Sequence, residues 1–193
     1  MTKTPPENNV WHTDVTWKPK PPLGSVLHAQ VLPNTGGDTM WVSMSAVYEA
    51  LTDIEKARFE NLRAVHSIET FTNSNEDYGD GNRVKAAMDQ FPPLQHPMLR
   101  THPETGQRSV FVNEGFTTHI ADVDPQESEA ILARIGQLVE RPEFQLRVQW
   151  EPLTLAIWDN RCTQHQAAAD YYPQFRKMHR VTITGDEPRL LQA

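Results

Sequence analysis

The chain carries a His-x-Asp pair, His12 and Asp14, near its start and a further histidine, His165, near its end. Two imidazoles and one carboxylate cover one face of an octahedral ferrous ion and leave three positions open. On a strand, residues two apart point to the same side, so His12 and Asp14 can hold one ion together. A fold that adds His165 must place a strand from the far end of the sequence beside the pair.

Length, net charge and cysteine content limit the kinds of protein that this chain can be. At 193 residues we expect a single domain spanning 1–193 with a substantial buried core. The formal net charge of −7 argues against a nucleic-acid partner. No run approaches the roughly 20 apolar residues of a membrane span, and no secretory leader is visible. Cys162 is the only cysteine, which excludes an internal disulfide and favours a reducing cytoplasm.

The pattern of apolar residues predicts a mostly β chain with flanking helices. Helices are expected at 45–51, 53–62, 84–90 and 125–140, and strands at 10–17, 25–32, 39–42, 65–71, 98–101, 109–112, 144–150, 153–158 and 179–184. Thr52 and Asp124 stand where two of the helices begin and can cap them. Short strands with interposed helices favour a β-sandwich or barrel with helical cover.

A His-x-Asp pair is common by chance, but here it lies within one of several blocks that follow one another in a fixed order. The blocks are 8–16 (NNVWHTDVT), 36–41 (GGDTMW), 102–106 (HPETG), 111–118 (FVNEGFTT), 158–165 (WDNRCTQH), 178–182 (MHRVT) and 185–186 (GD). Together they resemble the taurine dioxygenase (TauD/TfdA) family of Fe(II)/2-oxoglutarate-dependent oxygenases, over nearly the whole chain.

The resemblance implies a double-stranded β-helix, the cupin-like jelly roll, and an iron site. His12, Asp14 and His165 match the family's ligands to Fe(II). Arg176 matches the arginine that pairs with the distal carboxylate of 2-oxoglutarate, a role that suits a guanidinium because it stays charged and donates two parallel hydrogen bonds. Thr39 matches a hydroxyl donor to the same carboxylate. O₂ would take the remaining position on the metal.

The resemblance also implies how a small anionic substrate is held. Arg180 matches the position that binds the substrate's anionic group, a sulfonate in the namesake enzyme. Four other matches would line the substrate pocket: Asn8, the backbone amide of Val15, Phe116 and Trp158. No residue beyond the metal site is expected to be catalytic. The implied reaction hydroxylates a sulfonate such as taurine, giving an aldehyde and sulfite, with succinate and CO₂ as coproducts.

A departure from the family pattern keeps other interpretations open. Family members carry a longer segment before the His-x-Asp pair, whereas only 1–4 precede the match here, so we expect a jelly roll that lacks the family's N-terminal part. One alternative is the same chemistry on an alkyl sulfate or a small carboxylic acid. Another is a truncated, non-catalytic domain that binds metal and 2-oxoglutarate. We also expect a homo-oligomer.

Overall fold

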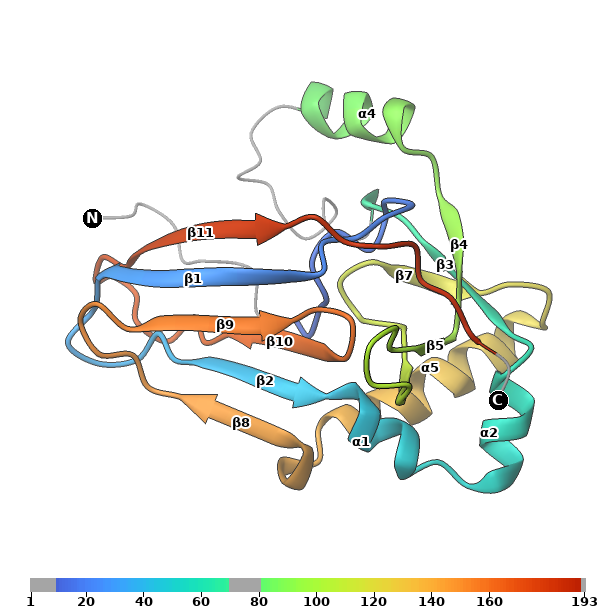
Figure 1. Cartoon of the computed structure of the whole chain (residues 1–193). Coiled ribbons are helices and arrows are strands. Elements are labelled where there is room, and N and C mark those ends of the chain that lie inside the picture. Colours follow the sequence, from blue (N-terminus) through green and yellow to red (C-terminus); the bar gives the residue numbers. More distant parts are fainter. Residues whose placement is uncertain (1–9, 70–80, 192–193) are drawn as a thin grey trace.

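Two antiparallel sheets of three strands each form one half of the molecule (Figure 1). The structure is a computed structural model that describes residues 10–69 and 81–191. In the first sheet the order is β11 (Lys177–Ile183), β1 (Gly24–Val31) and β9 (Leu155–Asp159); in the second it is β10 (Thr163–Ala167), β2 (Thr39–Ser43) and β8 (Gln145–Val148). Each central strand pairs with two strands from the far end of the sequence, as a jelly roll requires.

An aromatic core lies between these two sheets. Ala29 of β1, Trp41 of β2 and Trp158 of β9 are all buried in it. The rings of Trp41 and Trp158 meet edge to face at 5.5 Å, and Trp150 lies 6.3 Å from Trp41. Side chains two apart on a strand share a face, so Thr39 points to the same interior as Trp41. The interior of the sandwich therefore holds a polar hydroxyl beside its indoles.

The other half of the molecule contains the helices, two small sheets and the larger apolar core. Its elements are α1 (Met44–Glu49), α2 (Asp53–Phe59), β3 (Arg63–His66), α4 (Gly81–Gln90), β4 (Leu94–Pro97), β5 (Leu99–Thr101), β6 (Arg108–Val110), β7 (Thr117–Ile120), α5 (Pro125–Val139) and a short 3-10 turn at Pro142–Phe144. β3 lies between β4 and β7, and β5 pairs with β6.

The helices begin where local chemistry places them. Thr52 caps α2 and forms a capping box with Glu55. Asp124 accepts a hydrogen bond from the backbone of Gln126 at the start of α5. The apolar stripe of α5 is buried against the core, at Ile131, Ile135, Leu138 and Val139. Both predicted caps are confirmed.

The strand expected at 10–17 is wrong except at one residue. His12 alone forms an isolated antiparallel bridge, to His165. The chain then turns, because Val15 adopts a left-handed backbone with φ of 56° and its carbonyl accepts from the amide of Lys18 at 3.1 Å. A β-branched residue rarely takes this conformation, so the sequence pattern gives no warning of it. Strands β4 and β7 were likewise not expected.

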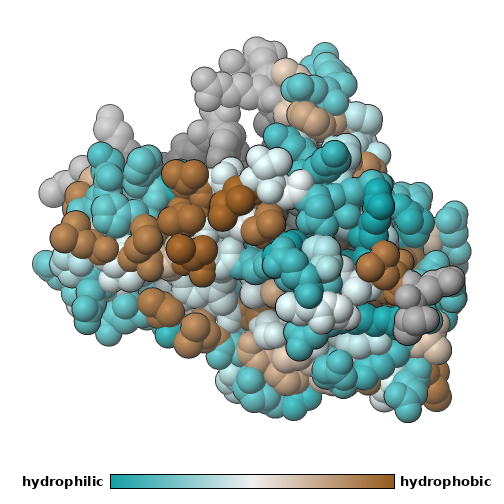
Figure 2. All heavy atoms as spheres, in the orientation of Figure 1, coloured by the Kyte–Doolittle hydropathy of each residue, from teal (hydrophilic) through white to brown (hydrophobic). Residues whose placement is uncertain are grey.

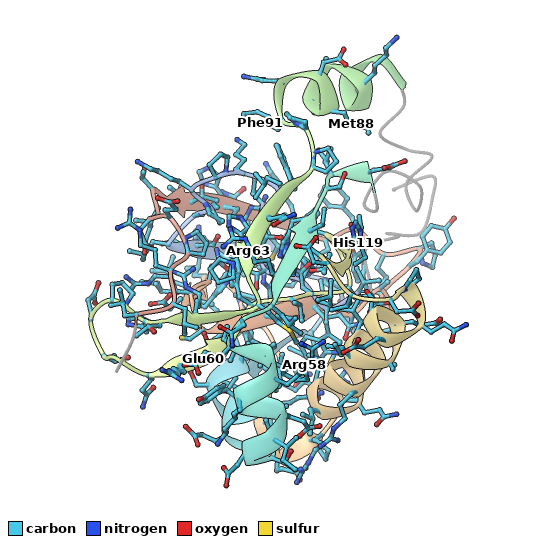
Figure 3. All side chains as sticks on the ribbon, turned by 90° about the vertical axis from the view of Figure 1, so that its right-hand side faces the viewer. Arg58, Glu60, Arg63, Met88, Phe91 and His119 are labelled. Carbon is cyan, nitrogen blue, oxygen red and sulfur yellow. The ribbon has the colours of Figure 1, made fainter. Side chains whose placement is uncertain are left out.

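Two surface features stand out. The outer face of the first sheet exposes a row of apolar side chains, visible as the brown area over it in Figure 2: Leu155, Ile157, Val181 and Ile183. In Figure 3, α4 stands away from the body at the end of β4. Phe91, just after α4, packs against the body of the molecule, and its ring lies 5.2 Å from that of Trp17. Among the described residues, no helix has the length and apolar character needed to cross a membrane.

Candidate metal centre

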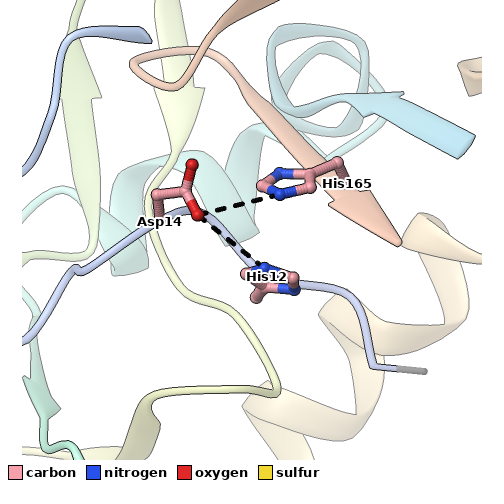
Figure 4. Close-up of side chains that lie close together, drawn as sticks. All are labelled: His12, Asp14 and His165. Atoms are coloured by element: carbon pink, nitrogen blue, oxygen red, sulfur yellow. Dashed lines mark ion pairs between the residues drawn. The ribbon is translucent and has the colours of Figure 1, made fainter. Parts of the chain in front are cut away.

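The structure brings His12, Asp14 and His165 together at one point (Figure 4). The Nε2 atoms of His12 and His165 lie 3.9 and 3.8 Å from the same oxygen of Asp14, Oδ1. The two imidazole rings are 4.3 Å apart between centroids. Asp14 and His165 are buried, and the side chain of His12 is 14% exposed. Three donor atoms of types that ferrous iron accepts thus converge, and His12 keeps some exposure to solvent.

Backbone pairing, rather than side-chain contact, sets the two histidines side by side. The amide of His12 donates to the carbonyl of His165 at 3.1 Å, and the amide of His165 donates back at 2.8 Å. Directly opposed residues of an antiparallel pair project to the same face. The turn that begins at Asp14 then directs the carboxylate toward both rings. His12 and Asp14 therefore face the same point because His12 forms a bridge and Asp14 begins a turn, not because both lie on one continuous strand.

The protonation states suit metal binding. Burial lowers the pKa of His165 to about 3, with His12 adding to the shift, and burial also lowers the pKa of His12. Burial alone would raise the pKa of Asp14, but His165 and Arg180 outweigh it and the pKa is lowered. The site is therefore poised as neutral imidazoles and a carboxylate, the forms that ligate. The Nδ1 atom of His12 lies 3.0 Å from the Val10 carbonyl, which fixes Nε2 as its free acceptor.

A partly buried arginine lies beside this centre. Arg176 donates from Nη2 to the hydroxyl of Thr39 at 3.3 Å, and the same hydroxyl accepts from the Trp150 indole at 2.9 Å. Within the part of the chain that the structure describes, Nε of Arg176 is buried and has no hydrogen-bond partner. Thr39 pairs with Ala167, two residues beyond His165 on β10, so its side chain shares a face with that histidine. An unpaired buried guanidinium nitrogen next to the donor set fits a bound carboxylate.

The residues expected to hold the substrate are placed unevenly. Arg180 is half exposed and donates from Nη1 to Oδ1 of Asp14 at 2.9 Å. Phe116 meets the ring of His12 edge to face at 6.1 Å, and Trp158 lies 4.9 Å from the ring of His165. Val15 lies directly after Asp14, in the turn described above. Asn8 lies outside the described residues.

Three further side chains at the centre were not expected from the sequence. Ser25 donates to Oδ2 of Asp14 at 2.7 Å, and Nδ2 of Asn160 lies 3.5 Å from the same oxygen. Trp150 joins the group through its bond to Thr39. Asn160 lies within the block 158–165 and could have been suspected there. Nothing in the sequence marks Ser25, because its contact with Asp14 forms only in the folded structure.

A second cluster has similar residue types but different surroundings. His102, Asp159 and Cys162 also offer donor atoms within 4.8 Å of one another. Here Nε2 of His102 lies 3.1 Å from Oδ2 of Asp159, and Nη2 of Arg161 donates to that oxygen at 2.7 Å. Burial raises the pKa of the Cys162 thiol, which disfavours the thiolate that a metal would need. This cluster reads as a structural ion-pair network.

Comparisons with known proteins agree with this geometry. A model described as "Taurine catabolism dioxygenase TauD, TfdA family" matches residues 1–182. The chain is 35% identical to an "Alkylsulfatase" of Acinetobacter baylyi, over 92% of this chain and 57% of that protein. It is 34% identical to "(S)-phenoxypropionate/alpha-ketoglutarate-dioxygenase" of Sphingobium herbicidovorans, over 96% of this chain and 66% of that protein. It thus spans less than two thirds of either relative.

A solved structure extends the likeness to the fold. "Crystal Structure of a Taurine Dioxygenase from Burkholderia xenovorans" superposes with a TM-score of 0.79 at 36% identity, covering 92% of this chain and 57% of that one. The jelly roll expected from the sequence is confirmed by this match together with the mostly-strand architecture.

Proposed function

Because the chain belongs to the TauD/TfdA family of taurine catabolism dioxygenases, we propose that it is an Fe(II)- and 2-oxoglutarate-dependent dioxygenase acting on a small anionic substrate. The observation that carries the proposal is the convergence of His12, Asp14 and His165 on one point next to the unpaired guanidinium of Arg176. Bound there, Fe(II) supplies the activation of O₂ that couples decarboxylation of 2-oxoglutarate, to succinate and CO₂, with oxidation of the substrate.

The protein's own residues would hold both the metal and 2-oxoglutarate. His12, Asp14 and His165 hold it in protonation states that need no rearrangement. Arg176 and Thr39 receive the distal carboxylate of 2-oxoglutarate, where burial strengthens a charge-assisted bond.

On the substrate side, Phe116 and Trp158 are buried beside His12 and His165, and their rings exclude water from the metal site.

Arg180 would supply the charge that orients the substrate. Its side chain is 48% exposed and lies against Asp14. A cation there favours a substrate whose anionic group is close to the carbon that is oxidised. We propose a sulfonate such as taurine, which would yield an aldehyde and sulfite. The alkylsulfatase and phenoxypropionate relatives support the same chemistry on an alkyl sulfate or a small carboxylic acid as the second candidate.

A panel assay tests the reaction and the substrate class together. Protein loaded with Fe(II) and 2-oxoglutarate would be given taurine, an unsubstituted alkanesulfonate, an alkyl sulfate and a phenoxypropionate, and succinate would be measured in each. Sulfite or sulfate release identifies the oxidised class. The matched control is His165→Ala, which should form no succinate with any of them.

Two outcomes contradict the proposal. If succinate forms equally without any of these anions, they are not substrates and the proposed substrate class is wrong. Binding of metal and 2-oxoglutarate with no substrate-dependent succinate from any anion would favour the non-catalytic binding domain instead. The cytoplasmic location and the homo-oligomer expected from the sequence stay predictions.

A further inference from the structure

The two oxygens of the Asp14 carboxylate have different surroundings. Oδ1 faces the Nε2 atoms of His12 and His165 at 3.9 and 3.8 Å. Oδ2 points the other way, accepts a hydrogen bond from Ser25 Oγ at 2.7 Å and lies 3.5 Å from Asn160 Nδ2. Ser25 and Asn160 are 0% and 2% exposed, so these contacts are shielded from water.

We propose that Ser25 and Asn160 are positioning residues that determine which oxygen Asp14 presents to the metal. A carboxylate turns readily about its last torsion, because the preference there is broad. Donors that hold Oδ2 keep Oδ1 turned toward the histidines. The second oxygen is then kept from the open positions that 2-oxoglutarate and O₂ need. The inference rests on the proposed function, since it concerns the same metal.

The sheet, rather than a flexible side chain, fixes these two donors. Ser25 lies on β1 opposite Trp158 on β9, and Asn160 follows β9 directly. The backbone amide of Asn160 donates to the carbonyl of Leu23 at 2.8 Å. Its side-chain oxygen accepts from the Trp158 indole at 2.8 Å, which turns the amide nitrogen toward Asp14. The register of β1 against β9 therefore sets the orientation of a residue that belongs to neither strand.

A competing contact explains why Oδ2 needs to be held. Arg180 donates to Oδ1 of Asp14 at 2.9 Å, the same oxygen that faces the histidines. This guanidinium is half exposed and can follow the carboxylate if the carboxylate rotates. An O–H donor to a carboxylate makes a strong charge-assisted bond, and here it acts on the opposite oxygen. Ser25 thus opposes rotation of Asp14 toward Arg180.

Titration with Mn(II), followed by the loss of the free-ion signal in electron paramagnetic resonance, tests the inference without turnover. Mn(II) accepts imidazole and carboxylate ligands and is stable in air. Ser25→Ala should weaken Mn(II) binding about 10- to 100-fold, the range typical for loss of a partner of a ligating side chain. Asn160→Ala should weaken it less, because its contact is longer.

Ser109→Ala is the matched control. Ser109 is also 0% exposed, and its hydroxyl donates at 3.2 Å to the Arg161 carbonyl, outside the centre. We expect its Mn(II) affinity to stay within twofold of wild type. Thermal unfolding of each variant with and without Mn(II) separates folding from binding: the rise in Tm on adding Mn(II) should shrink for Ser25→Ala and not for Ser109→Ala.

The outcomes divide cleanly. If the wild-type protein fails to bind Mn(II), the proposed function falls and this inference with it. If wild type binds while Ser25→Ala and Asn160→Ala bind equally well, the inference alone is overturned and the contacts are structural. If Ser25→Ala does not fold, a folded Asn160→Ala with weakened binding supports the inference and one with unchanged binding overturns it.

Discussion

In the part of the chain that the structure describes, two clusters of candidate metal ligands combine histidine with aspartate, and only one of these two has imidazole nitrogens free to bind a metal. At the first cluster, the Nε2 atoms of His12 and His165 have no hydrogen bond to a side chain of the described structure. At the second, His102 is already committed. Its Nε2 lies 3.1 Å from Asp159, and its Nδ1 accepts from the backbone amides of Glu104 and Thr105.

The two arginines near these clusters differ in the same way. Arg161 gives Nη2 and Nε to Asp159 and Nη1 to Glu104, so its guanidinium is enclosed by carboxylates. Arg176 bonds only to the Thr39 hydroxyl through Nη2, and its buried Nε has no partner in the described ranges. Residue types within reach of one another therefore do not define a site. The first cluster differs because its imidazole Nε2 atoms converge on Asp14 without pairing with it at hydrogen-bond distance.

The largest expected effect is on metal binding. His165→Ala should weaken Fe(II) or Mn(II) binding by more than about 100-fold, beyond the loss caused by removing a mere supporting group. With Fe(II) and 2-oxoglutarate under anaerobic conditions, the visible charge-transfer band expected of the wild type should vanish. Cys162→Ser, at the second cluster, should keep the band at full strength. A band retained in His165→Ala would reverse the assignment of the two clusters.

Arg176 should govern 2-oxoglutarate affinity and not folding. Truncating a buried charged pair costs about 2–5 kcal/mol of binding free energy, whereas a neutral hydroxyl bond contributes about 1 kcal/mol. Arg176→Ala should therefore weaken 2-oxoglutarate binding far more than Thr39→Ala, as measured by calorimetry on the metal-loaded protein. Equal affinity of wild type and Arg176→Ala for 2-oxoglutarate would show that Arg176 does not bind its carboxylate.

Arg161 should show the opposite behaviour. Arg161→Met leaves Asp159 without its main partner, and we expect the free energy of unfolding to fall by about 3 kcal/mol. Asp14→Asn, at the first cluster, should cost no more than about 1 kcal/mol in the metal-free protein, because the half-exposed Arg180 can turn to water. Urea unfolding without metal measures both. A larger loss of unfolding free energy for Asp14→Asn than for Arg161→Met would contradict the assignment of the second cluster as the structural one.

A buried histidine without a nearby acid provides the smallest test. His66 has an unpaired Nε2, but burial, with His96 adding, lowers its pKa to about 3. The unfolded chain then binds the extra proton between pH 6.5 and about 3, so stability is complete above pH 6.5 and declines as the pH falls below it. From pH 7 to pH 5 we expect His66 to account for about 2 kcal/mol of the lost free energy of unfolding.

Replacement of His66 by Gln separates its share from that of other groups. His66→Gln should flatten the dependence of urea unfolding on pH over this interval, and metal affinity at neutral pH should not change. An unaltered pH profile would mean that His66 is not the titrating group. A drop in metal affinity would show that an unpaired nitrogen matters even without a carboxylate beside it.

Much of the fold was predictable because its signals are local. Thr52 and Asp124 cap the helices that follow them, and the stripe of α5 packs into the core as its spacing indicates. The strand expected at 10–17 failed because Val15 takes a φ of 56° in a local turn, where its carbonyl accepts from the amide of Lys18, against the preference of a β-branched residue. β7 was missed because its four residues carry no clear alternation of apolar side chains.

By itself, the sequence determined the family and indicated the candidate metal site, because His12, Asp14, His165 and their flanking blocks follow one another in a characteristic order. It could not decide how those residues are oriented. The contact of Ser25 with Asp14 and the pairing of His102 with Asp159 both form only in the folded chain. Hydrogen bonds saturate and act over about 3 Å, so which donors remain free is settled by packing in three dimensions and not by composition.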